Sequence, residues 1–138
     1  MIDRSKFICI EASWVWKEAD LSFLNMPISI HVDTTIDSDQ AEREIFEEQW
    51  KTLDIIDQDW QEVAPLIEQE ILNYSQLPQS ELERVMVRPT IWLGMDSNKD
   101  EPWHNHKWSF VLGVSENEDF GWHVEFEGIS HVDTWAGG

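Results

Sequence analysis

The chain has 138 residues, 41% of them hydrophobic, which is enough for one domain with a single buried core. Its 28 acidic and nine basic side chains give a net charge of −19, which argues against nucleic acids and anionic membranes as partners, because both require Lys and Arg to neutralise their charge. Apolar runs stay far below the roughly 20 residues that cross a membrane, and the N-terminus does not read as a secretory signal, so we expect one cytoplasmic domain over residues 1–138.

Two strands are predicted near the start of the chain. Lys6–Trp16 is apolar on both sides at first, which is typical of a strand covered on both faces. Pro27–Thr34 alternates apolar and polar residues, as a half-buried strand does. The single cysteine, Cys9, lies in the first of these segments, where we interpret it as a small buried hydrophobe.

A long helical pattern follows over Asp39–Tyr74. Apolar residues recur there at steps of three and four, and Asp39 with Glu42 forms a plausible capping pair at its start. Pro65 has no backbone N–H and clashes with the preceding turn. The sequence therefore predicts a kink or break at Pro65, or two helices joined near Asp54–Asp59.

The remaining pattern predicts four more strands that form a meander of sequential neighbours. With the two earlier strands, they predict an α+β fold: a mainly antiparallel sheet of about six strands, with one kinked long helix or two helices packed on one face. The four strands are Val85–Leu93, Lys107–Val114, Trp122–Glu127 and Ser130–Trp135.

The helical region concentrates the negative charge. Asp37–Glu70 contains twelve acidic residues against Arg43 and Lys51, a net −10. Such a surface steers a basic protein towards it, although acidity also simply keeps a protein in solution. The candidate partner-binding acids are Glu44, Glu47, Glu48, Asp57 and Asp59.

Nine tryptophans are several times the usual content of a chain this long. Most of them alternate with aliphatic core positions in the predicted strands and are expected in the core. Three are better placed to anchor a partner, a role in which Trp is enriched. Trp14 and Trp16 lie on the same side of a predicted strand end, and Trp103 lies in a polar loop.

Histidines gather in the last third of the chain and offer an alternative, a metal-binding module or metal-dependent hydrolase. If the last two strands pair Val124 with Val132, two imidazoles share a face with two carboxylates, a set that could hold zinc. No spacing matches an established zinc motif, and such side chains ordinarily pair with one another across the strands. The four candidates are His104, His106, His123 and His131.

Sequence motifs for catalysis are missing. The chain has no Gly-rich dinucleotide fingerprint, no phosphate-binding loop and no nucleophile elbow, and its carboxylates are too numerous to single out a catalytic pair. We therefore expect a protein that is not an enzyme and holds no cofactor.

The C-terminal runs Trp108–Leu112, Asp119–Gly128 and Val132–Gly137 resemble the ending of small uncharacterised bacterial domains, some of which are immunity proteins of polymorphic toxin systems. The resemblance implies a non-enzymatic protein that binds and blocks a toxin, and it assigns no residue roles. We therefore expect an acidic interaction protein that binds a basic partner such as a toxin. The alternative is a structural domain that forms a homodimer through a sheet edge or an aromatic patch.

Overall fold

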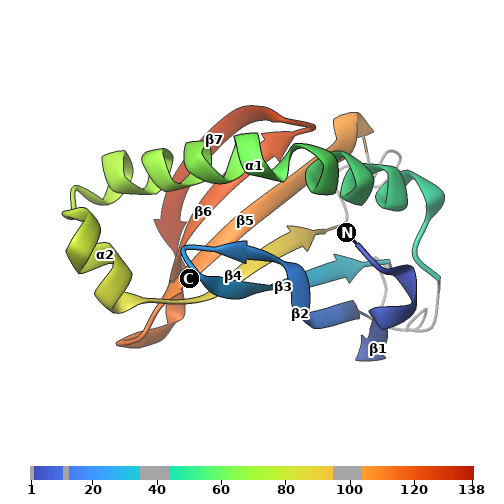
Figure 1. The fold of residues 1–138 in the computed structure, drawn as a ribbon, viewed down its shortest axis with the longest axis horizontal. Helices are drawn as coiled ribbons and strands as arrows, with labels where there is room; N and C mark the ends of the chain where they lie inside the picture. The colour runs from blue at the N-terminus through green and yellow to red at the C-terminus, as the bar shows by residue number, and fades with distance from the viewer. Residues whose placement is uncertain (1, 11–12, 35–43, 95–103) are drawn as a thin grey trace.

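The computed structural model describes residues 2–10, 13–34, 44–94 and 104–138. It shows a seven-stranded sheet in the order β1-β2-β3-β4-β5-β6-β7, with one long helix lying across one face (Figure 1). All neighbouring strands are antiparallel except β3 and β4. The predicted α+β class, with a mainly antiparallel sheet and helices, is confirmed.

The N-terminal part contains a short 3-10 helix and three strands. The 3-10 helix spans Arg4–Lys6, and the strands are β1 (Ile8–Ile10), β2 (Ser13–Phe23) and β3 (Met26–Asp33). The prediction of one strand over Lys6–Trp16 is wrong, because β1 pairs back onto the start of β2. Alternation with a period of two continues through both strands, so the pattern did not reveal the reversal between them.

Helix α1 spans Glu47–Ser75, 29 residues in one helix that passes through Pro65. The predicted break is wrong. Pro65 lies on the exposed side, while the opposite side stays buried over the whole length of the helix. Packing of this continuous buried stripe outweighs the one backbone hydrogen bond that a proline removes. The predicted capping pair, Asp39 and Glu42, lies outside the described residues.

The start of α1 is fixed to the sheet by Gln49, of which only 3% is exposed. Its Oε1 accepts a hydrogen bond from the backbone N–H of Phe46 at 3.1 Å, and its Nε2 donates to the carbonyl of Asp33 at 2.8 Å. One side chain thereby bonds a backbone donor at the helix start and a backbone acceptor at the end of β3.

A second helix, α2 (Gln79–Val85), leads into β4 (Met86–Leu93), which pairs in parallel with β3. This helix was not predicted. The chain then forms the expected antiparallel meander of β5 (Lys107–Val114), β6 (Asn117–Glu127) and β7 (Ser130–Gly137), with a 3-10 turn at His104–His106 before β5.

The core lies between α1 and the sheet, and α1 contacts β2, β5, β6 and β7. Four of the eight described tryptophans belong to it: Trp16, Trp60, Trp108 and Trp122. Two of their indole N–H groups reach backbone carbonyls, from Trp60 to Ser22 at 2.9 Å and from Trp108 to Gly128 at 2.7 Å. Among the described helices, none is both long and apolar enough to cross a bilayer.

Candidate functional site

The face of the sheet opposite α1 is covered by no described helix (Figure 1). Two neighbouring rows of side chains, in register across the strands, make up this open face. Alternation along each strand puts the core residues on the other side. The first row is Val15, His31, Trp92, Ser109, Glu125 and Asp133; the second is Ser29, Thr90, Val111, His123 and Trp135.

Two histidine–tryptophan stacks mark the open face. The rings of His31 and Trp92 have centroids 5.4 Å apart, and those of His123 and Trp135 have centroids 3.8 Å apart. The indole N–H of Trp92 donates to Asp33 Oδ2 at 3.0 Å. Trp92 is 40% exposed and Trp135 is 37% exposed, so both offer aromatic surface to a partner.

Burial lowers the pKa of both stacked histidines below its usual value. For His31, the carboxylate of Asp33 opposes this shift. For His123, a hydrogen bond with the backbone of Gly137 and the carboxylate of Glu125 oppose it. Both imidazoles are therefore neutral at pH 7, and a neutral ring on an indole presents a largely apolar surface.

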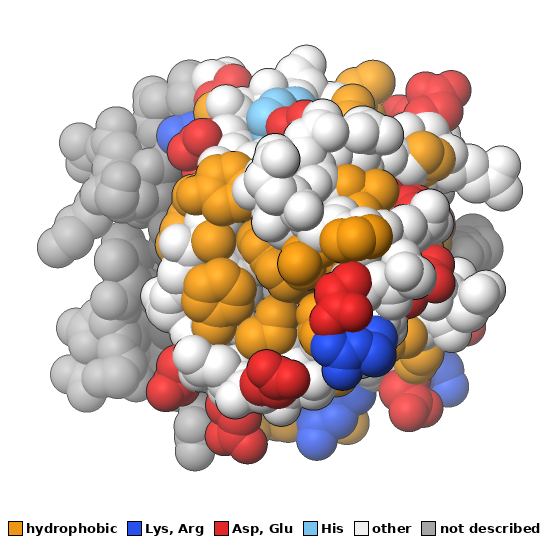
Figure 2. Space-filling view, turned by 90° about the vertical axis from the view of Figure 1, so that its left-hand side faces the viewer, with side chains coloured by type: hydrophobic (Ala, Val, Ile, Leu, Met, Phe, Trp, Pro, Cys, Tyr) orange, Lys and Arg blue, Asp and Glu red, His pale blue; other side chains and the backbone are white. Residues whose placement is uncertain are grey.

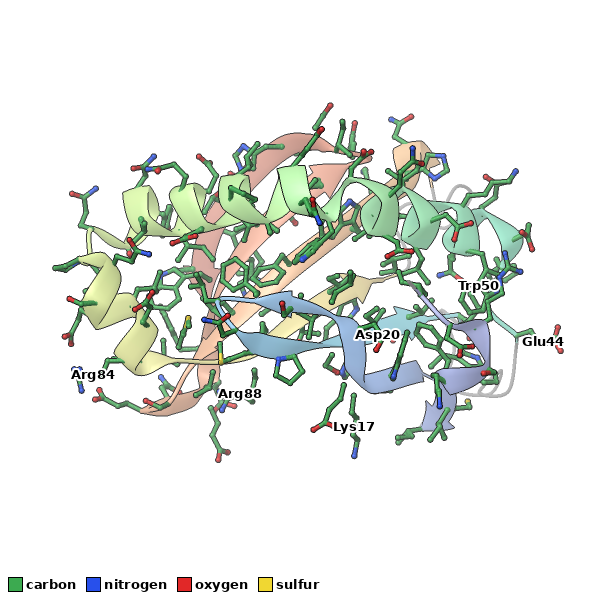
Figure 3. The ribbon with its side chains drawn as sticks, in the orientation of Figure 1. Lys17, Asp20, Glu44, Trp50, Arg84 and Arg88 are labelled. Atoms are coloured by element: carbon green, nitrogen blue, oxygen red, sulfur yellow. The ribbon has the colours of Figure 1, made fainter. Side chains whose placement is uncertain are left out.

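A groove of about 680 Å³ runs along the open face. Two basic side chains, Lys17 and Arg88, line it and point away from α1 (Figure 3). Apolar side chains, hydroxyls and the two neutral imidazoles supply much of its remaining surface, and Glu118 and Asp119 line its β6 end.

Three glycines in register leave part of the groove floor without side chains. Gly113, Gly121 and Gly137 are direct neighbours on β5, β6 and β7. The guanidinium of Arg88 lies against the first of them, since a Cβ added at Gly113 would come within 2.8 Å of Arg88 Nη2. The same nitrogen donates to the carbonyl of Val114 at 3.2 Å.

A second apolar surface lies at the end of the molecule that carries α2. Figure 2 shows hydrophobic side chains gathered on this end, with acidic and basic side chains around them. Tyr74, at the end of α1, is 49% exposed, and Leu77 and Val85 are partly buried against the core.

The five predicted partner-binding acids do not form one patch. Glu47 is ion-paired with Arg4 and Glu48 with Lys51, while Asp57 Oδ2 accepts a hydrogen bond from the backbone N–H of Ile2. Asp57 and Asp59 are two residues apart, about 200° around the helix axis, and so lie on opposite flanks of α1. Glu44 is exposed just before the helix (Figure 3).

None of the three predicted tryptophan anchors is an exposed side chain among the described residues. Trp16 is only 9% exposed and belongs to the core, and Trp14 packs partly buried against that core. Trp103 lies outside the described residues. The exposed tryptophans, Trp92 and Trp135, were not singled out from the sequence. Trp92 could have been found, because it stands between Ile91 and Leu93, both core residues on the other face of β4.

The histidines are dispersed. Val124 faces Thr134 instead of Val132, and a bulge follows, so His123 lies on the open face and His131 on the α1 side. His131 Nε2 is 3.1 Å from Glu70 Oε1, and His106 Nδ1 is 2.8 Å from Thr52 Oγ1. The side chain of His104 is not described.

Metal coordination needs three or more such ligands in one place. Within the described part of the chain, no three His, Cys, Asp or Glu side chains are grouped so that they could hold a metal ion.

The arrangement of the described residues offers surfaces for binding, above all on the open face. Comparison of the chain with protein-family models, with curated proteins and with solved structures found no match.

Proposed function

We propose that the protein is an acidic interaction protein, of the inhibitor or immunity type, that binds a basic partner protein on the open face of its sheet. The observation that carries this proposal is the asymmetry of the sheet. One face is covered by α1, while the other presents two exposed tryptophans beside a groove.

Hydrophobic exposure favours the open face over the helix as the contact surface. Ile8 and Ile10 of β1 are exposed and lie on the same side of the sheet as Val15. With Trp92 and Trp135, they give the open face four large exposed hydrophobic side chains. Large aromatic and aliphatic side chains in this position are typical of the centres of protein interfaces.

Carboxylates on the open face favour a basic partner. Glu125 and Asp133 face each other on β6 and β7, and Asp33 lies at the end of β3. Together with the net charge of −19, these groups attract a positively charged protein and speed its association at low salt. A toxin with a basic surface, met in the cytoplasm, is a partner of this kind.

Identification of the partner is the first experiment. The tagged protein is used to capture proteins from lysate of its native host at low and high salt. The affinity of the purified partner is then measured for Trp92→Ala, Trp135→Ala and, as a matched control at the α2 end, Tyr74→Ala. We expect each open-face variant to weaken binding by about 2 kcal/mol, or roughly 30-fold, with little effect of the control.

If both open-face variants keep their affinity for the partner and Tyr74→Ala loses it, the interface lies at the α2 end and not on the open face. Light scattering tests for a homodimer. If the natural chain is a dimer and Trp135→Ala is a monomer, the open face is the contact between two copies, since β7 is an edge strand and can pair with a second copy.

A further inference from the structure

We propose that an arginine side chain of the basic partner inserts between Trp92 and Glu125, above Ser109 of β5. In this position its guanidinium stacks on the indole of Trp92 and pairs with the carboxylate of Glu125. The inference rests on the proposed function, and it names the chemical group that the open face recognises.

A small pocket separates the two histidine–tryptophan stacks. Its volume is about 290 Å³, and it is lined by Trp92 of β4, Ser109 and Val111 of β5, and His123 of β6. The small side chain of Ser109 leaves a gap between its two larger neighbours, because Trp92 and Glu125 are its direct partners on the adjoining strands. A pocket of this size suits one long side chain, since sites for small molecules are usually larger.

The pocket exposes one face of the Trp92 indole. The opposite face is covered by His31, whose ring centroid lies 5.4 Å away and whose plane is tilted by 20°. His31 lies on β3 and the pocket on the β5 side, so the two are on opposite sides of β4. A hydrogen bond to Asp33 orients the indole, which is 40% exposed. A Trp ring held in this way offers the best side-chain surface for a cation–π contact.

Carboxylates beside the pocket favour a cation as its occupant. Glu125 and Asp133 are direct cross-strand partners on β6 and β7. Like charges that face each other in this way repel. Among the described residues, no Lys, Arg or His side chain lies within salt-bridge distance of either carboxylate. A cation from outside the chain relieves the repulsion, which is the charge complementarity expected with a basic partner.

Spacing across the sheet suits a guanidinium. The backbones of Trp92 and Glu125 are two strand spacings apart, about 10 Å. A planar group in contact with the indole lies about 3.5–4 Å from it, which leaves the Glu125 side chain room to meet that group from the other side. His123 is neutral at pH 7, because burial lowers its pKa, and does not repel a cation. Arginine is favoured over lysine because a guanidinium can stack and still donate two hydrogen bonds to one carboxylate.

A pair of capped peptides tests the pocket without the partner. The probe is acetyl-Gly-Arg-Gly-amide, and its control has Lys in place of Arg and carries the same charge. Binding is followed by NMR from the indole N–H signal of Trp92 and the backbone amide signals of Ser109 and Glu125. We expect the Arg peptide to bind at least about fivefold more tightly. Unspecific attraction to this acidic protein predicts equal binding of the two peptides.

Three variants locate the binding. Glu125→Gln removes the carboxylate, and Ser109→Leu fills the pocket without changing any charge. Each is expected to reduce the preference for the Arg peptide by at least about threefold. Glu118→Gln removes the same charge from an exposed position at the far end of β6 and should leave the preference unchanged. Equal binding of the two peptides, or a preference that survives in both pocket variants, would overturn the inference.

The purified partner completes the test. Glu125→Gln should weaken its binding at least about tenfold, and Glu118→Gln should have little effect. Unchanged affinity of the partner for Glu125→Gln would overturn the assignment of the pocket to a partner arginine. The proposed function fails separately. If the Arg preference is absent but Trp92→Ala and Trp135→Ala still weaken the partner, the open face remains the interface and only the arginine assignment is lost.

Discussion

The imidazole of His123 lies flat on the indole of Trp135, with ring centroids 3.8 Å apart and planes 2° from parallel. The contact joins neighbouring strands β6 and β7 on the open face, where the two residues are direct cross-strand partners. Burial there favours the neutral ring, so the pKa of His123 lies below its usual 6.5.

This stack predicts a loss of stability in acid. When the folded pKa is the lower one, the unfolded chain takes up the proton first as pH falls. The contribution of His123 to the free energy of unfolding is therefore fully present above pH 6.5, and it is lost as the pH falls below that value. Urea midpoints at pH of about 7.5 and about 5.5 should differ less in His123→Phe than in the natural chain, although His31 leaves some dependence. An imidazole signal of His123 that titrates above 6.5 would contradict this explanation.

Gln49 predicts a large effect of a single amide. Gln49→Ala removes the hydrogen bonds from this side chain to the carbonyl of Asp33 and to the N–H of Phe46, and we expect a loss of about 2–3 kcal/mol in the free energy of unfolding. Gln58→Ala, on the exposed side of the same helix, should change it by less than about 0.5 kcal/mol. Equal urea midpoints for the two variants would show that the helix start does not depend on this link.

Pro65 predicts a stabilising substitution. Pro65→Ala restores a backbone donor inside α1, and part of the gain is offset by a more flexible unfolded chain. We expect the free energy of unfolding to rise by about 1–2 kcal/mol in thermal or urea unfolding. A decrease would mean that the proline gives α1 a curvature on which its packing depends. Gln61→Ala, one turn earlier and also exposed, serves as the control.

The glycine row predicts a contrast between two alanines. A Cβ at Gly113 meets the flexible end of Arg88, whereas a Cβ at Gly121 comes within 3.2 Å of the carbonyl oxygen of Leu112. Gly113→Ala should displace the guanidinium and cost less than about 1 kcal/mol of stability, while Gly121→Ala should cost about 1–3 kcal/mol. Urea unfolding measures both values, and the reverse order would contradict the position of Arg88.

Much of the fold was predictable because local pattern and tertiary structure agree. The range of β5 was predicted residue for residue as Lys107–Val114, since its large core residues Trp108, Phe110 and Leu112 recur at every second position. The prediction of a break at Pro65 was wrong because it considered only the local backbone chemistry of proline. The core contacts of Ile56, Trp60 and Ile67 keep the helix continuous. The hairpin of β1 and β2 carries no turn signal that interrupts its alternation.

The site was harder to predict, because its residues meet only through strand pairing. His31, Trp92 and Ser109 come from three separate strands, and only the register makes them neighbours. The bulge between Glu125 and Phe126 shifts the pairing of β6 with β7 by one residue and moves His131 to the face opposite His123, and no residue pattern announced it. Acidic residues on α1 were visible in the sequence, but their intramolecular partners Arg4, Lys51 and Ile2 were not.

The parallel pairing of β3 with β4 has a consequence for the order of folding. Ile30 meets Ile91 across roughly sixty residues of intervening chain, whereas the other strand pairs join sequence neighbours. The two antiparallel segments, β1–β3 and β4–β7, can each form early by closing short loops. Their junction must wait for the long loop that contains α1 to close, and this step is expected to limit the rate at which the complete sheet appears.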